Sequence, residues 1–340
     1  MSHKLVSFGL LLTLFWISPA DTIASVEASK TRRHSAGSTN PVLWRDPADI
    51  AQRNLFWGPG GKKHAPRGTV FSFVEENRAA SNPKFLVRDA NGVEWKVKLG
   101  AEAKPETAAT RLVWAAGYFA DEDYYLPEIR VTGLPAKVKR GKQFLGPNGI
   151  MYGARLERHH SGHKNVGNWA WKDNPFLDDR RLNGLRVLMA VMNSWDLKDE
   201  NNDILQSKER PESIYTVSDL GAAFGTTGFA RSQAKAKGNL GQYERSKFIT
   251  HVTPQYVDFA TPARPSFWWL YDVTAFRRRV RLEELGKRIP RADARWMGQV
   301  LARLSRHQIA DAFRAAGYSP SEVNGFTTVV ERRIAELRRL

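Results

Sequence analysis

The 340-residue sequence contains no cysteine. This absence excludes disulfides, thiolate metal sites, a cysteine nucleophile and lipid attachment at an amino-terminal cysteine. The sequence also lacks the Gly-x-Ser-x-Gly nucleophile elbow of esterases. Residues 58–63 (Gly-Pro-Gly-Gly-Lys-Lys) do not complete a phosphate loop, because Phe56 replaces its first glycine and Lys63 replaces its hydroxyl residue. We therefore predict a simple turn at 58–63.

Acidic residues are scarce relative to basic ones. The chain has 35 Asp+Glu against 52 Lys+Arg, which gives a formal net charge of +17. Such an excess favours acidic partners, here an anionic lipid, a glycan or an acidic protein. The basic residues are scattered, and no specific nucleic-acid motif accompanies them. A solvated basic surface is the simpler explanation, and an acidic substrate is the alternative.

Long hydrophobic runs are confined to the amino terminus. Lys4 precedes an apolar run over 5–17, which small residues follow, and this order is typical of a cleavable signal peptide. We therefore expect a signal peptide over 1–24 and an exported protein, periplasmic or extracellular, with no transmembrane helix in its mature form. An uncleaved anchor or a buried helix is the alternative. Residues 25–40 are polar and small, which predicts a disordered leader.

Residues 84–100 have the pattern of a β-hairpin. Two alternating segments flank Asp-Ala-Asn-Gly at 89–92, and Asn-Gly in such a position is a strong hairpin signal. Lys96 and Lys98 are two residues apart in the second segment. Both side chains are therefore expected on the same face of that strand.

A helix is predicted directly after the hairpin, over 104–117. Pro105 suits a first helical position, the apolar spacing is helical, and Gly117 closes the segment. Glu106 lies in the first turn, where it can reach back to a lysine of the preceding strand. A second helix is predicted over 178–193, with acidic residues in its first turn.

Strand signals concentrate in the first half of the chain, and helical spacing dominates the second. Beyond the two helices above, helical patterns cover 292–315 and 319–340. We therefore predict an α+β fold with a strand-rich part over 41–149 and a helical part over 150–340. About 300 residues remain after the leader, enough for two parts with a sizeable core.

The most specific chemical pattern is Asp-Leu-Lys-Asp-Glu-Asn at 196–201, followed by Asp219. Asp196 is suited to orient an attacking hydroxyl, and Lys198 to neutralise a phosphoryl group in transfer. Asn201 and Asp219 are suited to hold metal ions that bridge phosphates. Asp196 and Asp219 have apolar neighbours in the sequence, and carboxylates in such surroundings usually have a partner or a function. The pattern thus favours a phosphotransferase.

Together, the strand lysine, the helix glutamate, 196–201 and Asp-Leu-Gly at 219–221 resemble the protein-kinase-like fold over about residues 69–225. The resemblance is closer to its atypical branches: HipA-type kinases, spore-coat CotH kinases, secretory-pathway casein kinases and phosphoinositide kinases. It implies two lobes, a small strand-rich N-lobe and a mainly helical C-lobe, with nucleotide between them.

The resemblance also implies a role for each matching residue. Lys98, with Lys96 as second choice, would bind the α- and β-phosphates, and Glu106 would pair with that lysine. The catalytic residues would be Asp196 and Lys198. Asn201 and Asp219 would ligate Mg²⁺ or Mn²⁺, and ATP or another nucleoside triphosphate would be the donor.

Several departures separate the chain from conventional protein kinases. Residues 193–195 (Asn-Ser-Trp) stand in place of the His-Arg pair, and Leu220 replaces the usual phenylalanine. The Gly-rich loop and the Ala-Pro-Glu motif are missing. We therefore expect an exported, atypical kinase-like phosphotransferase acting on a hydroxyl of a protein, lipid or glycan. A catalytically inactive kinase-like binding module, or transfer of AMP, is the alternative.

Three further features have simpler interpretations. Asn202 is a reserve metal ligand or a turn residue. His159, His160 and His163 form the single histidine cluster, which favours a surface loop over a metal site. Residues 268–271 (Trp-Trp-Leu-Tyr) favour a core position over a carbohydrate platform.

Overall fold

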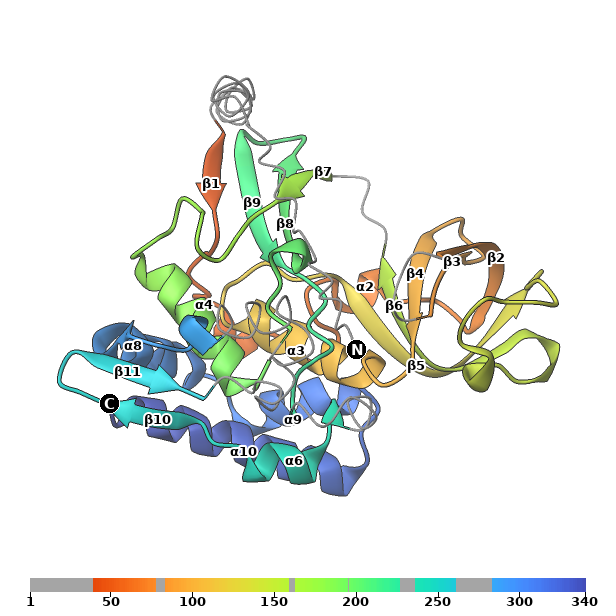
Figure 1. Cartoon of the computed structure of the whole chain (residues 1–340). Coiled ribbons are helices and arrows are strands. Elements are labelled where there is room, and N and C mark those ends of the chain that lie inside the picture. The colour runs from red at the N-terminus through yellow and green to blue at the C-terminus, as the bar shows by residue number, and fades with distance from the viewer. Residues whose placement is uncertain (1–38, 78–82, 159–162, 195, 227–235, 261–282) are drawn as a thin grey trace, which may run out of the picture. The chain divides into compact units, whose positions relative to one another are not determined.

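The computed structural model describes residues 39–77, 83–158, 163–194, 196–226, 236–260 and 283–340 (Figure 1). Residues Asn40–Leu340 form one compact unit. The predicted signal peptide and most of the predicted leader lie outside the described residues. Asn40, the last residue of that leader, begins a strand. Within the described ranges, no helix has the length and apolarity needed to cross a membrane.

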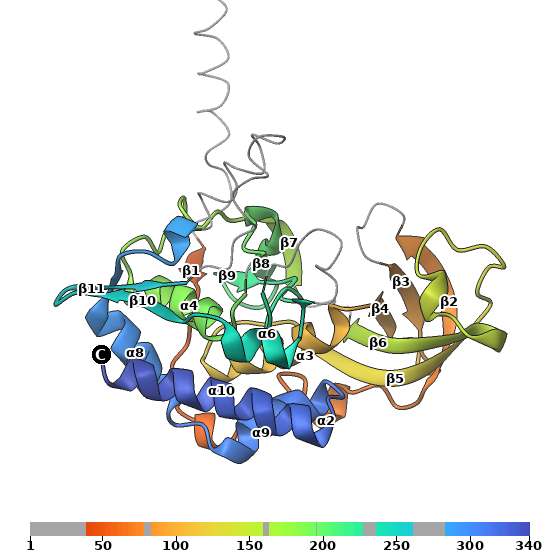
Figure 2. The same ribbon diagram turned by 60° about the horizontal axis from the view of Figure 1, so that its bottom comes forward.

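Five strands close into a barrel in the order β2-β3-β4-β6-β5 (Figures 1 and 2). These strands are β2 (Val70–Asn77), β3 (Lys84–Arg88), β4 (Glu94–Leu99), β5 (Asp123–Thr132) and β6 (Ile150–Arg158). The pair β2–β5 is parallel and the other four pairs are antiparallel. Alternate side chains such as Phe85, Trp95 and Val97 are buried in one apolar cluster inside the barrel.

The predicted hairpin over 84–100 is confirmed as β3 and β4. Asp89 closes the turn, because its Oδ1 accepts hydrogen bonds from the backbone N–H groups of Asn91 (2.9 Å) and Val93 (3.0 Å). Gly92 has a φ of 80°, in the left-handed region that glycine occupies without strain. This turn fixes the register that places Lys84 directly opposite Lys98.

The predicted helix after the hairpin is confirmed as α3 (Ala103–Ala115). Its Leu112 and Val113 belong to a second apolar cluster, which is built mainly by the helices of the chain. The helix α9 (Arg306–Ala315) packs against α3. The helix α3 thus joins the barrel to the helical core, because it also contacts β5 and β6.

The other predicted helices are present with altered bounds. Residues 178–193 form α4 (Arg180–Val191), which Asp179 caps by accepting from the backbone N–H of Arg181. Residues 292–315 form two helices, because Ser305 starts a new one with a capping box. The bounds are α8 (Arg291–Leu301), α9 as above and α10 (Pro320–Arg338), with the short helices α2 (Gly61–His64), α6 (Leu240–Arg245), η1 (Ile50–Gln52), η2 (Lys142–Phe144), η3 (Pro147–Gly149) and η4 (Asp199–Asn201).

The second half of the chain contains strands as well as helices. The alternation of residues 214–219 predicts a strand that delivers Asp219, and β9 (Glu212–Val217) confirms that strand. The other strands of this half were not indicated by the sequence patterns. One sheet has the order β1-β9-β8-β7 and another has the order β10-β11-β12. Their bounds are β1 (Asn40–Val42), β7 (His163–Asn168), β8 (Asn202–Ser207), β9 (Glu212–Val217), β10 (Ile249–Val252), β11 (Tyr256–Phe259) and β12 (Ile289–Pro290). The barrel also runs past residue 149, because β6 pairs with β4 and β5. The fold is mixed α+β throughout.

Candidate active site

Lys98 lies at the centre of a buried ionic cluster. Its neighbours Val97 and Leu99 point into the barrel core, so the alternation of β4 turns Lys98 toward α3. The side chain is only 3% exposed. Its Nζ donates to Glu106 Oε2 at 2.6 Å and to Glu102 Oε2 at 3.3 Å. It also contacts Asp219 Oδ1, so residues from three separate segments meet at one ammonium group.

Lys96, the second predicted phosphate ligand, takes no part in this cluster. Its Nζ forms an ion pair with Glu157 Oε1 at 2.8 Å, and its side chain is 56% exposed. The predicted pairing with the helix glutamate therefore belongs to Lys98. The structure separates two lysines that the sequence left as alternatives.

Sequence reasoning missed three charged partners of the cluster. Glu102 is the N-cap residue of α3, four residues before Glu106, and this i,i+4 spacing was the signal that could have found it. Lys237 pairs with Glu102 from a distant part of the chain. Arg155 on β6 pairs with Glu106 Oε1 at 3.0 Å. Both oxygens of Glu106 are thus held by cations.

Asp219 reaches the cluster through an unusual backbone conformation. It follows β9 with a φ of 54°, in the left-handed region that non-glycine residues seldom adopt. Two residues later, at Gly221, the chain passes close to α3. A Cβ added to Gly221 would lie only 2.4 Å from Glu102 Cβ. The glycine of the Asp-Leu-Gly motif is therefore required by this close approach.

The cluster favours the charged forms of Lys98, Asp219 and Glu102 but not that of Glu106. Burial lowers the pKa of Lys98, but Glu106, Asp219 and Glu102 outweigh it, and the pKa lies above the ordinary value. Burial raises the pKa of Asp219, yet the charge and hydrogen bond of Lys98 outweigh it and lower the pKa to about 2. For Glu102, Lys98 and Lys237 likewise lower the pKa against the effect of burial. For Glu106 burial prevails and raises the pKa.

The predicted catalytic residues form a second group. Lys198 Nζ lies 2.8 Å from the carboxylate of Asp196. Asn201 Nδ2 donates to the backbone oxygen of Asp196 at 3.0 Å, which closes the segment into a compact turn. The backbone oxygen of Asn201 accepts from the N–H of Ser218 (2.8 Å) and from its hydroxyl (2.9 Å). These two bonds tie the turn to the residue before Asp219.

The oxygen donors of the two groups suit a hard divalent cation. Mg²⁺ and Mn²⁺ prefer carboxylate, amide carbonyl and water oxygens. Asp219 offers a one-third exposed carboxylate, of which Lys98 contacts Oδ1. Asn201 uses the nitrogen of its side-chain amide for Asp196, and the amide oxygen is the donor atom for a metal. The oxygen atoms of Asp219 and Asn201 are thus of the kind that the predicted metal prefers.

The reserve candidates lie elsewhere. Asn202 is 1% exposed, and its Nδ2 donates to Trp169 O at 3.1 Å, so it joins β8 to the segment after β7. His163 begins β7. His159, His160 and the aromatic segment 268–271 fall outside the described residues.

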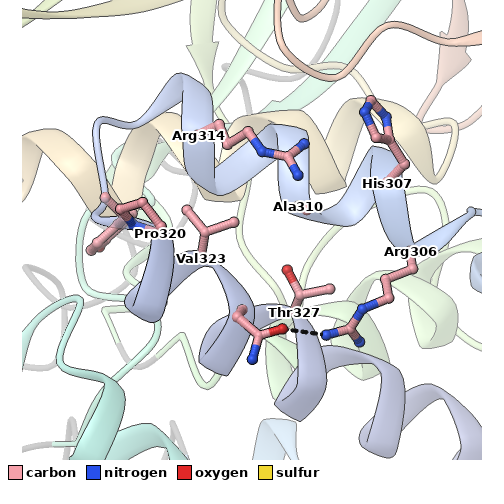
Figure 3. A pocket seen from close by; sticks show the side chains of 9 residues that line it. Arg306, His307, Ala310, Arg314, Pro320, Val323 and Thr327 are labelled. Atoms are coloured by element: carbon pink, nitrogen blue, oxygen red, sulfur yellow. Dashed lines mark hydrogen bonds between the residues drawn. The ribbon is translucent and has the colours of Figure 1, made fainter.

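A cavity of about 530 Å³ lies between α9 and α10 (Figure 3). Its cationic side chains are already paired. Arg306 bonds to Asn324 and forms an ion pair with Glu331, and Arg314 pairs with Asp311 at 2.5 Å. This cavity therefore offers less to a phosphate group than the Lys98 cluster does.

Replacing Glu106 by alanine is expected to destabilise the chain by about 3–5 kcal/mol, because it leaves Lys98 and Arg155 buried with fewer counter-charges. Urea unfolding measures this free energy. The control is Glu94→Ala, which removes an exposed pair with Arg88 and should cost less than about 1 kcal/mol. Equal losses in the two variants would contradict a structural role for the cluster.

No family model matches the chain, and no curated protein matches it. Among solved structures, the chain is similar to the crystal structure of a Helicobacter pylori proinflammatory kinase, CtkA. The two chains are 11% identical with a TM-score of 0.47, and the alignment covers 79% of this chain and 97% of that chain.

Proposed function

We propose that the protein is an atypical kinase-like phosphotransferase. It would move a phosphoryl group from ATP, or another nucleoside triphosphate, to a hydroxyl acceptor. The observation that carries the proposal is the contact of Lys98 with both Glu106 and Asp219. A strand lysine held by a helix glutamate, beside a carboxylate suited to bind metal, is the arrangement that kinase-type phosphoryl transfer uses.

Lys98 would bind the phosphates of the nucleotide in this scheme. It already faces three carboxylates, so an incoming phosphate chain needs further positive charge nearby. Asp219 and Asn201 would hold Mg²⁺ or Mn²⁺, which supplies that charge when bound. Metal-dependent nucleotide binding is therefore the first property that the site should display.

Asp196 would orient the acceptor hydroxyl and accept its proton. Its carboxylate is about one-quarter exposed, so an acceptor can reach it. Lys198 forms an ion pair with that carboxylate. During transfer it would move to the phosphoryl group and neutralise its negative charge. Proximity to Asp219 through the Ser218–Asn201 bonds supports a joint site.

The proposal extends to compartment and acceptor on the strength of the sequence. The amino-terminal pattern supports export, and the net charge of +17 supports an acidic acceptor, such as an anionic lipid, glycan or acidic protein. The two-lobed arrangement, with nucleotide between the barrel and the helical part, belongs to the same proposal.

A thermal-shift assay tests nucleotide binding. The full chain would be heated with ATP, GTP or ADP, each with Mg²⁺ or Mn²⁺ and each without metal. We expect a metal-dependent rise in the melting temperature, since ligand at 100 times its Kd stabilises by about 2.7 kcal/mol. Lys98→Met should lose this rise, and Lys96→Met should keep it. No shift with any nucleotide would contradict the proposal and favour a binding module without activity.

A further inference from the structure

The connection between β5 and β6 returns across one edge of the barrel. Glu76, near the end of β2, accepts hydrogen bonds from the backbone N–H groups of Lys139 (2.9 Å) and Arg140 (3.1 Å). Gly141 packs on Pro83, since a Cβ at Gly141 would lie 2.8 Å from Pro83 Cβ. The backbone oxygen of Pro83 also accepts from Leu99 N at 3.1 Å. The loop is therefore fixed against the ends of β2, β3 and β4.

A cavity of about 370 Å³ opens at this edge, and we name it the rim cavity. Its lining is Pro83, Lys139, Arg140, Gly141, Lys142 and Gln143. Three of these six residues are cationic, and no carboxylate is among the described residues that line it. Such a lining attracts anions.

Arg140, which lines the rim cavity, has a donor without an acceptor. Its Nη1 atom is buried and has no hydrogen-bond partner among the described residues. A buried guanidinium nitrogen without an acceptor carries the full cost of losing its water. An anion in the rim cavity would offer an acceptor to the guanidinium group of Arg140, whose planar shape suits phosphate oxygens.

The rim cavity is distinct from the Lys98 cluster but shares strands with it. Lys98 faces Glu106 and Asp219, on the side of β4 that leads to α3. Gly141, by contrast, packs on Pro83 and approaches the side chain of Leu99, which belongs to the barrel core. The Lys98 cluster and the rim cavity thus lie at the same end of β4, one on each side of the strand.

We propose that the rim cavity binds a phosphate group, with Arg140 and Lys142 as its principal ligands. The group can come from two sources. One source is the phosphate chain of the nucleotide, and this possibility rests on the proposed function above. The other source is a separate phosphate-bearing molecule, and this possibility is independent of the proposed function.

Isothermal titration of the full chain with inorganic pyrophosphate, and separately with ATP and Mg²⁺, tests this proposal. Arg140→Gln and Lys142→Gln should each weaken pyrophosphate binding by about tenfold or more, as expected for a lost charge-assisted hydrogen bond. Lys142 is exposed, so its variant should not disturb folding. Lys137→Gln is the matched control, because Lys137 is exposed in the same loop and outside the lining.

Each outcome decides between the sources or against the site. If both lining variants weaken ATP binding as well as pyrophosphate binding, the cavity receives the nucleotide. If they weaken pyrophosphate binding alone, and Lys98→Met weakens ATP binding alone, the cavity receives a separate phosphate. Lining variants that match Lys137→Gln with both probes overturn the proposal. Failure of Lys98→Met to change ATP binding would instead count against the proposed function.

Discussion

Replacing Asp219 by alanine is expected to abolish Mg²⁺-dependent binding of ATP while the chain stays folded. Asp219 is the most exposed carboxylate of the Lys98 cluster, and its pKa of about 2 keeps it ionised across the physiological range. Residues that only support metal ligands are already worth 10–100-fold in affinity, so losing a ligand should cost at least about 100-fold. Isothermal titration with ATP, with and without Mg²⁺, measures the loss.

Folding should survive this substitution because Lys98 keeps two other carboxylates. Glu106 and Glu102 remain within reach of its Nζ when Asp219 is removed. A suitable control is Asp203→Ala, since that carboxylate lies on β8 and accepts from Asn165 at 2.8 Å. If the Asp219 variant binds ATP and Mg²⁺ as the parent does, the metal assignment is wrong.

Local sequence patterns predicted the elements that carry the cluster. Asn-Gly at 91–92 and the alternation around it fixed the hairpin, whose register needs only neighbouring residues. Pro105 and the apolar spacing after it predicted α3. That prediction also placed Glu106 in the first turn of the helix, close to the preceding strand. The pairing of Lys98 with Glu106 follows from these two local features.

Partners that arrive from distant segments could not be read from the sequence. Arg155 reaches Glu106 because β6 pairs with β4 in a register that only the closed barrel sets. Lys237 reaches Glu102 from beyond β9, where no periodic pattern marks its direction. The strand β7 (His163–Asn168) is mostly exposed and polar, and it forms through its pairing with β8 rather than through its own alternation.

The second large effect is expected at Asp196. Asp196→Ala should reduce phosphoryl transfer by about 10²–10⁴-fold, the usual range for a positioned general base, and leave ATP binding within about twofold of the parent. The reason is that Asp196 lies outside the Lys98 cluster and forms an ion pair with Lys198 instead. Transfer of label from [γ-³²P]ATP to the chain itself, or to water, measures the rate without a known acceptor.

Glu200→Ala is the matched control for this variant, because it removes an exposed carboxylate from the same short segment. A loss of only about tenfold at Asp196 would be too small for a base that positions the attacking hydroxyl. If the parent chain binds ATP with Mg²⁺ and yet transfers no phosphoryl group, the proposed phosphotransferase activity is wrong. Lys98, Glu106 and Asp219 would then serve binding alone, and an inactive kinase-like module would be the better account of the site.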